Sequence, residues 1–304
     1  NATLGREIIP EYQATPAPRR KKVMVAGAGP CGMEAARVAA ERGHEVTLYE
    51  KSSRVGGLVP LAAIVKDCET PELVDFVRWQ KRQLKKVGVR IRTKTPVDAA
   101  LVRAEQPDAV ILAAGAIHPE TELPGVGLKN FIRTESLYRK LDFYLKFLTP
   151  ALLQKLTHLW MPVARRVVIM GGALHGCELA EFLVKRHRRV IVAHNGPEAE
   201  LGDEMGRDDL ANLFPWFKQK YVVLWPNVVY REITPHGLKV QQPDRRQYIL
   251  PGKSVINTQD WAANTKLLEE ISATGVEVQI VGSAREPGFM ADAVREGVLA
   301  GCAV

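Results

Sequence analysis

The sequence contains few cysteines, and none of them is spaced for a metal cluster or a redox-active disulfide. The four cysteines form no CxxC or CxxxxC pair, and they stand at Cys31, Cys68, Cys177 and Cys302. This scattered usage indicates a reducing, cytoplasmic compartment. It also argues against a metal site or a catalytic disulfide within the chain. We therefore predict no metal-ligating residues.

Long hydrophobic runs are also missing. No apolar stretch reaches the roughly 18 residues that span a bilayer, and the first twenty residues are polar and contain proline, unlike a signal peptide. Hydrophobic residues make up 46% and charged residues 25% of 304 positions. Those values are typical of a globular protein with room for two ordinary domains. The chain begins with Asn1 rather than Met, so we expect a piece of a longer protein.

Aromatic residues are sparse, at 7%, while the net charge is +8. Basic residues cluster at positions 19–22, 81–94 and 185–189, without the aromatic interleaving of nucleic-acid-binding motifs. Such clusters are typical of solvated surfaces, and they also attract phosphorylated cofactors or an acidic partner. Nucleic-acid binding is not indicated.

The stretch from Val23 to Glu50 has the pattern of a dinucleotide-binding fold. It is typical of a strand, a glycine turn, a helix beginning at Pro30 and a second strand that ends in an acid. The glycines of Gly27-x-Gly29-x-x-Gly32 permit the tight turn, the approach of a pyrophosphate and close helix–strand packing. The phosphates then lie on the helix N-terminus, and Glu50 accepts hydrogen bonds from the adenosine ribose.

Three later segments are predicted to reach the same cofactor. Residues 51–58 contain a glycine pair that lets a loop pass close to the phosphates. Residues 107–116 are typical of a buried parallel strand that ends in small residues, against which a cofactor can lie. A closing strand over residues 276–283 leads into a helix whose N-terminus would lie near a flavin. The contact residues predicted from these segments are Lys51, Gly57, Ala114, Gly115 and Ala293.

Residues 166–178 repeat the first pattern. An equal shift along the chain maps Gly27 onto Gly171, Gly32 onto Gly176 and Glu50 onto His194. The repeat has an alanine at the second glycine position, where a methyl group would meet the pyrophosphate. The predicted contact residues of the second site are Gly172, Ala173, Leu174, His175, Glu178 and His194.

The histidine at the ribose position bears on the choice of nucleotide. His194 removes the acid that would repel a 2′-phosphate, which favours NADPH over NADH. Arg188 and Arg189 precede the same strand, and we expect them to assist in binding that phosphate. A second site that binds nucleotide poorly is the alternative.

Between the two repeats, residues 134–162 show helical periodicity with a break at Thr149-Pro150. The pair of predicted helices is basic and aromatic in character. It is interpreted as a helical hairpin packed on its own domain. Two alternatives are a docking surface for another subunit or domain and, less expected, contact with a membrane surface.

These motifs together resemble those of known flavoproteins. The stretches GAGPCGMEAA, VTLYEK, PDAVILAAG and GGALHGCELAEFL are similar to those of proteins with two dinucleotide-binding domains. More closely, the chain resembles the C-terminal half of the iron–sulfur flavoenzymes of the dienoyl-CoA reductase and trimethylamine dehydrogenase family. The resemblance implies an α/β fold with two Rossmann-like, glutathione-reductase-like domains, the second inserted in the first.

The predicted domain organisation follows from this resemblance. Residues 1–20 are a lead-in from a missing upstream region, residues 21–133 and 270–304 form the FAD-binding domain, residues 134–163 are a helical insertion, and residues 164–269 bind NADPH or NADH. The resemblance places Cys31 and Glu50 at the adenosine half of FAD, and Leu58 and Val97 along its length. Leu58 stands where relatives often have Gln. Further FAD contacts are expected from Gly282 and from Ser283, which stands where relatives usually have Asp.

The chemistry implied by the resemblance is hydride transfer from NADPH or NADH to FAD, followed by single-electron transfer to an iron–sulfur cluster and FMN. Those groups and an acyl-CoA-type substrate belong to the missing upstream barrel and cluster domain. Hydride transfer depends on positioning, so no catalytic side chain is assigned here. The alternatives are a free-standing NAD(P)H:acceptor reductase and an ADP-type or non-catalytic nucleotide-binding module. A homo-oligomer is also compatible with the sequence.

Overall fold

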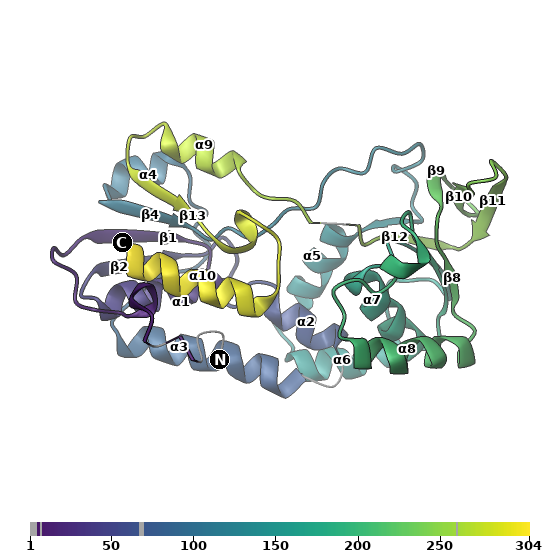
Figure 1. Ribbon diagram of the computed structural model, residues 1–304, viewed down its shortest axis with the longest axis horizontal. Helices are drawn as coiled ribbons and strands as arrows, with labels where there is room; N and C mark the ends of the chain where they lie inside the picture. Colours follow the sequence, from purple (N-terminus) through teal and green to yellow (C-terminus); the bar gives the residue numbers. More distant parts are fainter. Residues whose placement is uncertain (1–4, 7, 67–69, 260) are drawn as a thin grey trace. The chain divides into compact units, whose positions relative to one another are not determined.

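A computed structural model describes residues 5–6, 8–66, 70–259 and 261–304, so Cys68 lies outside the described residues. The chain divides into two compact units (Figure 1). The first comprises residues 1–62, 71–117 and 261–304, and the second comprises residues 63–70 and 118–260. The first unit ends its second segment at Ile117, which forms an isolated antiparallel bridge with Ala262 where the chain returns.

The first unit contains a five-stranded parallel sheet with strand order β13-β4-β1-β2-β3. The side chains of successive β1 residues point to opposite faces of the sheet. Val23 and Val25 belong to one hydrophobic cluster, while Met24 and Ala26 belong to another. The sheet is therefore buried on both sides, as parallel sheets are. Its strands are β1 (Lys22–Ala26), β2 (Glu45–Tyr49), β3 (Arg90–Arg92), β4 (Ala109–Leu112) and β13 (Glu277–Ile280).

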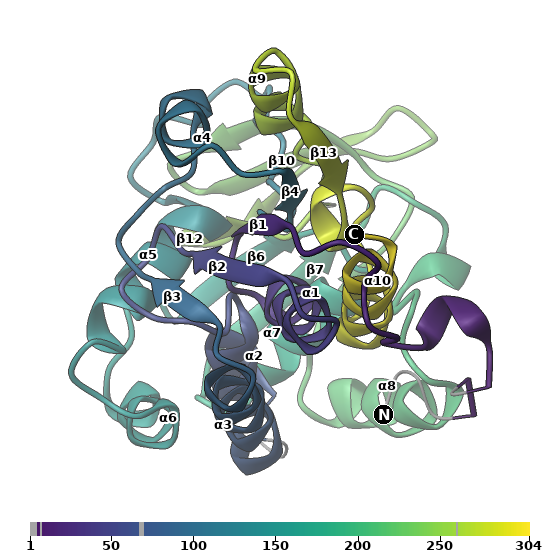
Figure 2. The same ribbon diagram turned by 90° about the vertical axis from the view of Figure 1, so that its left-hand side faces the viewer.

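Helices cover both faces of this sheet (Figure 2). On one face lie α1 (Pro30–Glu41), α3 (Thr70–Lys86) and α10 (Met290–Ala303), and on the other lie α4 (Ala99–Glu105) and α9 (Lys266–Ser272). Helices α1 and α10 pack closely because small residues meet. A Cβ atom added at Gly297 would lie 2.4 Å from the carbonyl oxygen of Cys31. Shorter elements are η1 (Pro10–Tyr12), α2 (Val59–Val65) and η3 (Gly282–Ala284).

The second unit contains a parallel sheet with order β5-β12-β6-β7-β8 and a three-stranded antiparallel sheet with order β11-β10-β9. One hydrophobic cluster, which includes Val168, Met170, Leu238 and Val240, joins the two sheets. The parallel strands are β5 (Phe131–Arg133), β6 (Arg166–Met170), β7 (Arg189–Ala193), β8 (Val223–Trp225) and β12 (Ser254–Asn257), and the antiparallel strands are β9 (Val229–Thr234), β10 (Gly237–Gln241) and β11 (Gln247–Pro251). The predicted α/β class with two Rossmann-like sheets is confirmed.

The two helices predicted within residues 134–162 are present as α5 (Thr134–Tyr144) and α6 (Pro150–Leu159). Helix α6 buries Leu153 and Thr157, and the hydroxyl of Thr157 accepts a 2.6 Å hydrogen bond from Nε of the fully buried Arg186. Its other side chains include the exposed Leu159. Helix α6 is thus attached to its own unit by a buried polar contact.

The remaining helices of the second unit are α7 (Leu174–Val184), α8 (Arg207–Gln219) and the 3₁₀ turn η2 (Glu198–Glu200). The sequence pattern of residues 214–260 predicts short strands and turns, and this prediction is wrong for residues 214–219, which lie in α8. The helix continues through Pro215 and buries Leu213 and Phe217. That apolar contact compensates for the hydrogen bond that proline cannot donate.

Candidate functional site: two glycine turns and their ribose positions

The first glycine turn connects β1 to α1. Gly27 has a φ of 108°, and a Cβ atom there would lie 2.3 Å from the carbonyl oxygen of Ala113. A Cβ atom at Gly32 would lie 1.9 Å from the carbonyl oxygen of Gly27. Gly29 differs, because no atom lies within 4 Å of its Cβ position. Two of the three glycines are therefore required by the protein's own backbone, and the third leaves open space beside the N-terminus of α1.

Glu50 lies at the carboxyl end of β2 and is buried next to this turn. One carboxylate oxygen accepts a 2.9 Å hydrogen bond from the backbone N–H of Ala28, and the other accepts a 2.8 Å hydrogen bond from the backbone N–H of Ser52. A carboxylate has about four acceptor positions, so each oxygen retains capacity for a ribose hydroxyl. The side chain is held in place before any ligand binds.

A glycine pair lies on top of the first turn. The N–H of Gly56 donates a 2.7 Å hydrogen bond to the carbonyl oxygen of Ala28, and a Cβ atom at Gly57 would lie 3.0 Å from Cα of Gly29. Lys51 and Leu58, which flank this loop, are both exposed. The loop therefore brings backbone and the predicted contact residues to the edge of the phosphate position.

Other predicted contacts divide between the edge of this turn and the core. Ala114 and Gly115 follow β4 and are half-buried. Val97 packs against the cluster under α4, and Ala293 packs against the cluster under α10. The described contacts thus place Val97 and Ala293 at least partly in the hydrophobic cores.

Cys31, in the first turn of α1, lies against the closing turn η3. A Cβ atom at Gly282 would lie 2.8 Å from the sulfur of Cys31, and the N–H of Gly282 donates a 2.7 Å hydrogen bond to the carboxylate of Glu296. Burial and the nearby Glu296 raise the pKa of the Cys31 thiol to about 12. Ser283 is half-buried beside it. Cys31 is therefore a protonated packing residue rather than a nucleophile.

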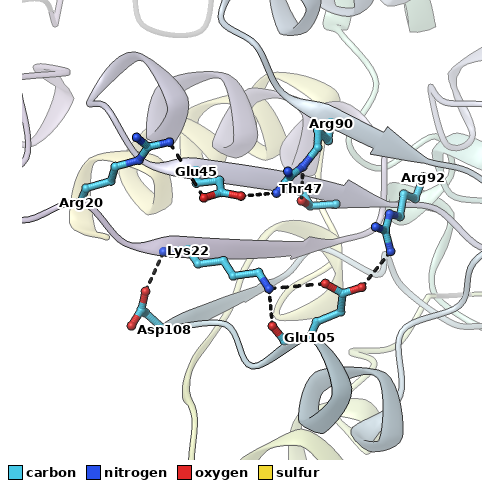
Figure 3. Close-up of polar contacts among 8 residues, drawn as sticks. All are labelled: Arg20, Lys22, Glu45, Thr47, Arg90, Arg92, Glu105 and Asp108. Atoms are coloured by element: carbon cyan, nitrogen blue, oxygen red, sulfur yellow. Dashed lines mark hydrogen bonds and ion pairs between the residues drawn. The ribbon is translucent and has the colours of Figure 1, made fainter.

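A set of paired charged side chains extends from the opposite, amino edge of the first sheet (Figure 3). Lys22 at the start of β1 donates its backbone N–H to Asp108 at 2.7 Å and lies 3.5 Å from Glu105. Arg90 at the start of β3 contacts Glu45 at the start of β2. These charges pair with one another, while the carboxyl edge, with its glycines and Glu50, is the candidate ligand-binding edge.

The second glycine turn, between β6 and α7, repeats the backbone of the first. Gly171 has a φ of 103°, and a Cβ atom at Gly176 would lie 2.0 Å from the carbonyl oxygen of Gly171. Ala173 has φ −71° and ψ −168°, close to the φ −75° and ψ 179° of Gly29. The alanine therefore fits the turn without altering its path.

His194 occupies the position that corresponds to Glu50. It is buried after β7, and its Nδ1 accepts a 3.2 Å hydrogen bond from the backbone N–H of Gly172, the residue that corresponds to Ala28. The N–H of Gly202 donates a 2.7 Å hydrogen bond to the carbonyl oxygen of Gly172, as Gly56 does to Ala28. The side chain at the ribose position and the covering loop are thus both repeated.

The second site differs from the first at the start of its helix. Leu174 donates its N–H to the carbonyl oxygen of Asp203 at 3.0 Å, whereas the corresponding Pro30 has no N–H. Glu178 lies 3.2 Å from Lys66 in an ion pair, and His175 is exposed. Position N1 therefore offers no N–H to a phosphate in either turn, which leaves that role to later residues of the first helical turn.

Two features near His194 differ from the sequence-based expectation. Arg188 and Arg189 lie at the amino end of β7, roughly 13 Å along the strand from its carboxyl end, and Arg188 donates to the carbonyl oxygen of Arg186 at 2.8 Å. The expectation that they assist in binding a 2′-phosphate is wrong. Glu200, which the sequence analysis did not single out, lies 3.8 Å from Nε2 of His194. Its place in the three-residue 3₁₀ turn η2 leaves no periodic signal in the sequence.

An open groove continues this edge of the second sheet beyond His194. Its volume is about 530 Å³, and it is lined by Leu224, Trp225, Pro226, Asn227, Gln242, Pro243 and Asp244. The N–H of Asn227 donates a 2.8 Å hydrogen bond to the carbonyl oxygen of Gly196, which joins the groove to the segment after β7.

Neither a metal centre nor a membrane span is found in the described part of the chain. Among these residues, no three His, Cys, Asp or Glu side chains are grouped to hold a metal ion. No helix there is both long and apolar enough to cross a bilayer.

Comparison with known proteins supports the interpretation of both turns. The chain is 28% identical to an NADH oxidase of Thermoanaerobacter brockii, over 98% of this chain and 43% of that protein. It is 30% identical to a bilirubin reductase of Mediterraneibacter gnavus, over 99% of this chain and 43% of that protein. A solved 2-naphthoyl-CoA reductase complex shares the fold, with a TM-score of 0.85 and 24% identity. The matched region is 100% of this chain and 43% of the reductase chain.

The chain thus spans about 43% of the length of these relatives. The predicted resemblance to the dienoyl-CoA reductase and trimethylamine dehydrogenase group is confirmed by the relatives, which also include a cinnamate reductase and an alkene reductase/demethylase. A family model described as pyridine nucleotide-disulphide oxidoreductase matches residues 21–279. The chain is an FAD- and NAD(P)H-type oxidoreductase and belongs to the pyridine nucleotide-disulphide oxidoreductase family.

Proposed function

We propose that this chain is the FAD- and nicotinamide-nucleotide-binding part of a larger flavoenzyme, with FAD on the first unit and NADPH or NADH on the second. The observation that carries the proposal is the repeat of one hydrogen-bonded turn, in which Ala28 donates to Glu50 and Gly172 donates to His194. When bound, the nicotinamide would supply a hydride and the flavin would accept it and release electrons one at a time.

The contribution of the first unit is positioning. Glu50 would accept hydrogen bonds from the adenosine ribose while it continues to hold the turn through Ala28. The open space beside Gly29 would admit a pyrophosphate to the N-terminus of α1, where the helix dipole favours negative charge. Small residues at Gly57 and Gly115 would let the cofactor lie against backbone. Because a hydride carries no proton to be removed, these roles require no general acid or base.

The rest of the enzyme is proposed to contain the electron acceptor. Relatives more than twice as long as the matched region include proteins named as reductases and as an NADH oxidase. We propose that the further part holds an iron–sulfur cluster and FMN and reduces an enoyl-CoA-like substrate. The name of the 2-naphthoyl-CoA reductase is consistent with an acyl-CoA substrate of this kind.

An anaerobic absorbance titration of the purified chain with NADH and with NADPH tests the core of the proposal. We expect a bound flavin whose absorbance is bleached by at least one of the two. Glu50→Ala should purify with less FAD, while Glu45→Ala serves as the matched control, because Glu45 lies at the amino end of the same strand.

A flavin that neither nucleotide bleaches would favour an ADP-type or non-catalytic binding module instead. Electron transfer to the further part is tested in the longest natural form of the protein. There, reduction of the flavin should be followed by reduction of a cluster and of FMN, and an enoyl-CoA should reoxidise them. Full activity of this chain alone toward a small acceptor, without reduction of any cluster in the longer form, would favour a free-standing reductase.

A further inference from the structure

The acid missing from the second ribose position is replaced from a different part of the chain. Glu200 belongs to η2, which follows the loop after β7, and its carboxylate lies 3.8 Å from Nε2 of His194. A Cβ atom at Gly196 would lie 2.2 Å from that carboxylate and 2.7 Å from Nε2. Both polar groups therefore lie beside the backbone of Gly196, just beyond the carboxyl end of β7. Glu50 has the corresponding position after β2 in the first unit.

The hydrogen bond at Nδ1 of His194 indicates which ring nitrogen carries a proton. Because the N–H of Gly172 donates to Nδ1, that nitrogen is an acceptor, and Nε2 is the ring nitrogen that carries a proton. The N–H of Nε2 is then directed to the side of Glu200. One donor and one carboxylate acceptor stand together at the ribose position.

This pair suits a ribose diol and not a phosphate. A hydroxyl can donate to the Glu200 carboxylate and accept from Nε2–H of His194, so both protein groups are satisfied. A 2′-phosphate has no proton to donate in its dianionic form and would meet a like charge. In the described part of the chain, Glu200 has no lysine or arginine partner that could offset this charge.

We propose that His194 and Glu200 together select the unphosphorylated adenosine ribose, so that the second unit takes NADH in preference to NADPH. The inference rests on the proposed function, namely nucleotide binding by the second unit. The sequence alone predicts a preference for NADPH, because His194 has no negative charge. The carboxylate of Glu200 supplies that charge beside His194, so the expected preference is reversed. His194 positions the turn and donates to the diol, and Glu200 determines the specificity.

Calorimetric binding of ADP-ribose and of 2′-phospho-ADP-ribose to the FAD-loaded chain tests this directly. Neither ligand contains nicotinamide, so the result does not depend on flavin reduction. The wild type should bind ADP-ribose at least about tenfold more tightly. In Glu200→Gln the ratio should fall to about twofold, mainly through tighter binding of the phosphorylated ligand. Glu198→Gln, which removes an equal charge from the same exposed turn, should leave the ratio unchanged.

The outcomes separate this inference from the function on which it rests. Equal or tighter binding of the phosphorylated ligand by the wild type would overturn the role of Glu200, and so would equal shifts in the two variants, since that result indicates only general charge. If either of these two results were obtained and NADH still bleached the flavin, the inference would fail but the proposed function would be retained. If neither ligand binds, nucleotide binding by the second unit and the inference both fail.

Discussion

The two glycine turns share one backbone but use different side chains to support it. The residue after each first glycine donates its N–H to the side chain at the ribose position, which is Glu50 in the first unit and His194 in the second. The Glu50 carboxylate carries a negative charge itself, whereas in the second unit the negative charge is that of Glu200, 3.8 Å from His194. The comparison shows that the fold requires an acceptor at this position, while the choice of ligand depends on where the charge lies.

The surroundings of the turns differ more than the turns themselves. In the first unit, α10 packs across α1, and η3 closes over Cys31. In the second unit, an antiparallel sheet covers the parallel one instead. The part common to both is therefore the strand, turn, helix and second strand, and this is the part that contacts a dinucleotide in such folds.

The largest expected effect tests which glycines the shared backbone needs. Gly32→Ala and Gly176→Ala would each place a methyl carbon about 2 Å from a backbone carbonyl oxygen. Each should lower the free energy of unfolding of its own unit by about 3 kcal/mol or more. Gly29→Ala is the matched control, with open space and a φ of −75°, and should cost less than about 1 kcal/mol. Urea unfolding followed by a probe in each unit measures these values, and equal losses at positions 29 and 32 would contradict the account.

The next largest effect concerns the acceptor of the first turn. Glu50→Ala leaves the buried N–H of Ala28 without its partner, which should cost about 1–3 kcal/mol in stability and also lower FAD retention. Glu50→Gln keeps an acceptor oxygen for Ala28 but turns an NH2 group toward the N–H of Ser52 and loses the charge, so it should lose less stability than Glu50→Ala while also binding FAD less tightly than the wild type. The flavin-to-protein ratio after purification, read beside the melting temperature, separates the two roles. Unchanged flavin content in Glu50→Ala would exclude a ribose contact.

Most of the shared turn could be predicted from the sequence, because steric demands restrict it so strongly. The predicted second strand, which leads into Glu50, is observed at Glu45–Tyr49, and the helix predicted to begin at Pro30 does so. At Gly27 and Gly32 a side chain would collide with a carbonyl oxygen, so only glycine is compatible with the turn. Constraints of this kind leave a visible pattern in the sequence.

Glu200 and α8 could not be predicted in the same way. Glu200 contacts His194 from the short 3₁₀ turn η2 that follows the loop after β7, so no helical or strand periodicity connects the two residues in the sequence. Helix α8 continues through Pro215 because Leu213 and Phe217 are buried, a tertiary effect that outweighs the local signal of proline. What could not be predicted therefore depends on contacts between segments rather than on local sequence.

A smaller effect, on ligand choice alone, is expected from exchanging the acceptor of the second turn. His194→Glu should keep an acceptor for the N–H of Gly172 and place a second carboxylate beside Glu200. The preference should shift further from NADPH toward NADH, by about tenfold. His194→Gln, with an acceptor and no charge, should change the ratio much less. Rates of flavin reduction by the two nucleotides measure this, and equal rates with both, before and after the exchange, would remove the ribose role of position 194.

The smallest effect uses one buried thiol in each unit as a reporter. Burial and Glu296 raise the pKa of Cys31 to about 12, and burial raises the pKa of Cys177 to about 12. At pH 8 only about one folded thiol in 10⁴ is ionised, so iodoacetamide should reach each site mainly when its unit opens. Half-buried Cys302 is the internal control and should react before Cys31 and Cys177.

The pH dependence of these thiols has a definite sign. Each stays protonated in the folded unit but ionises near pH 9 when unfolded, so its contribution to stability is complete below about pH 9 and is lost as the pH rises toward 12. FAD should slow the labelling of Cys31, and ADP-ribose should slow that of Cys177, as read by peptide mass spectrometry. If either ligand protected both thiols equally, the two turns would not be separate sites, because each ligand stabilises only the unit that binds it.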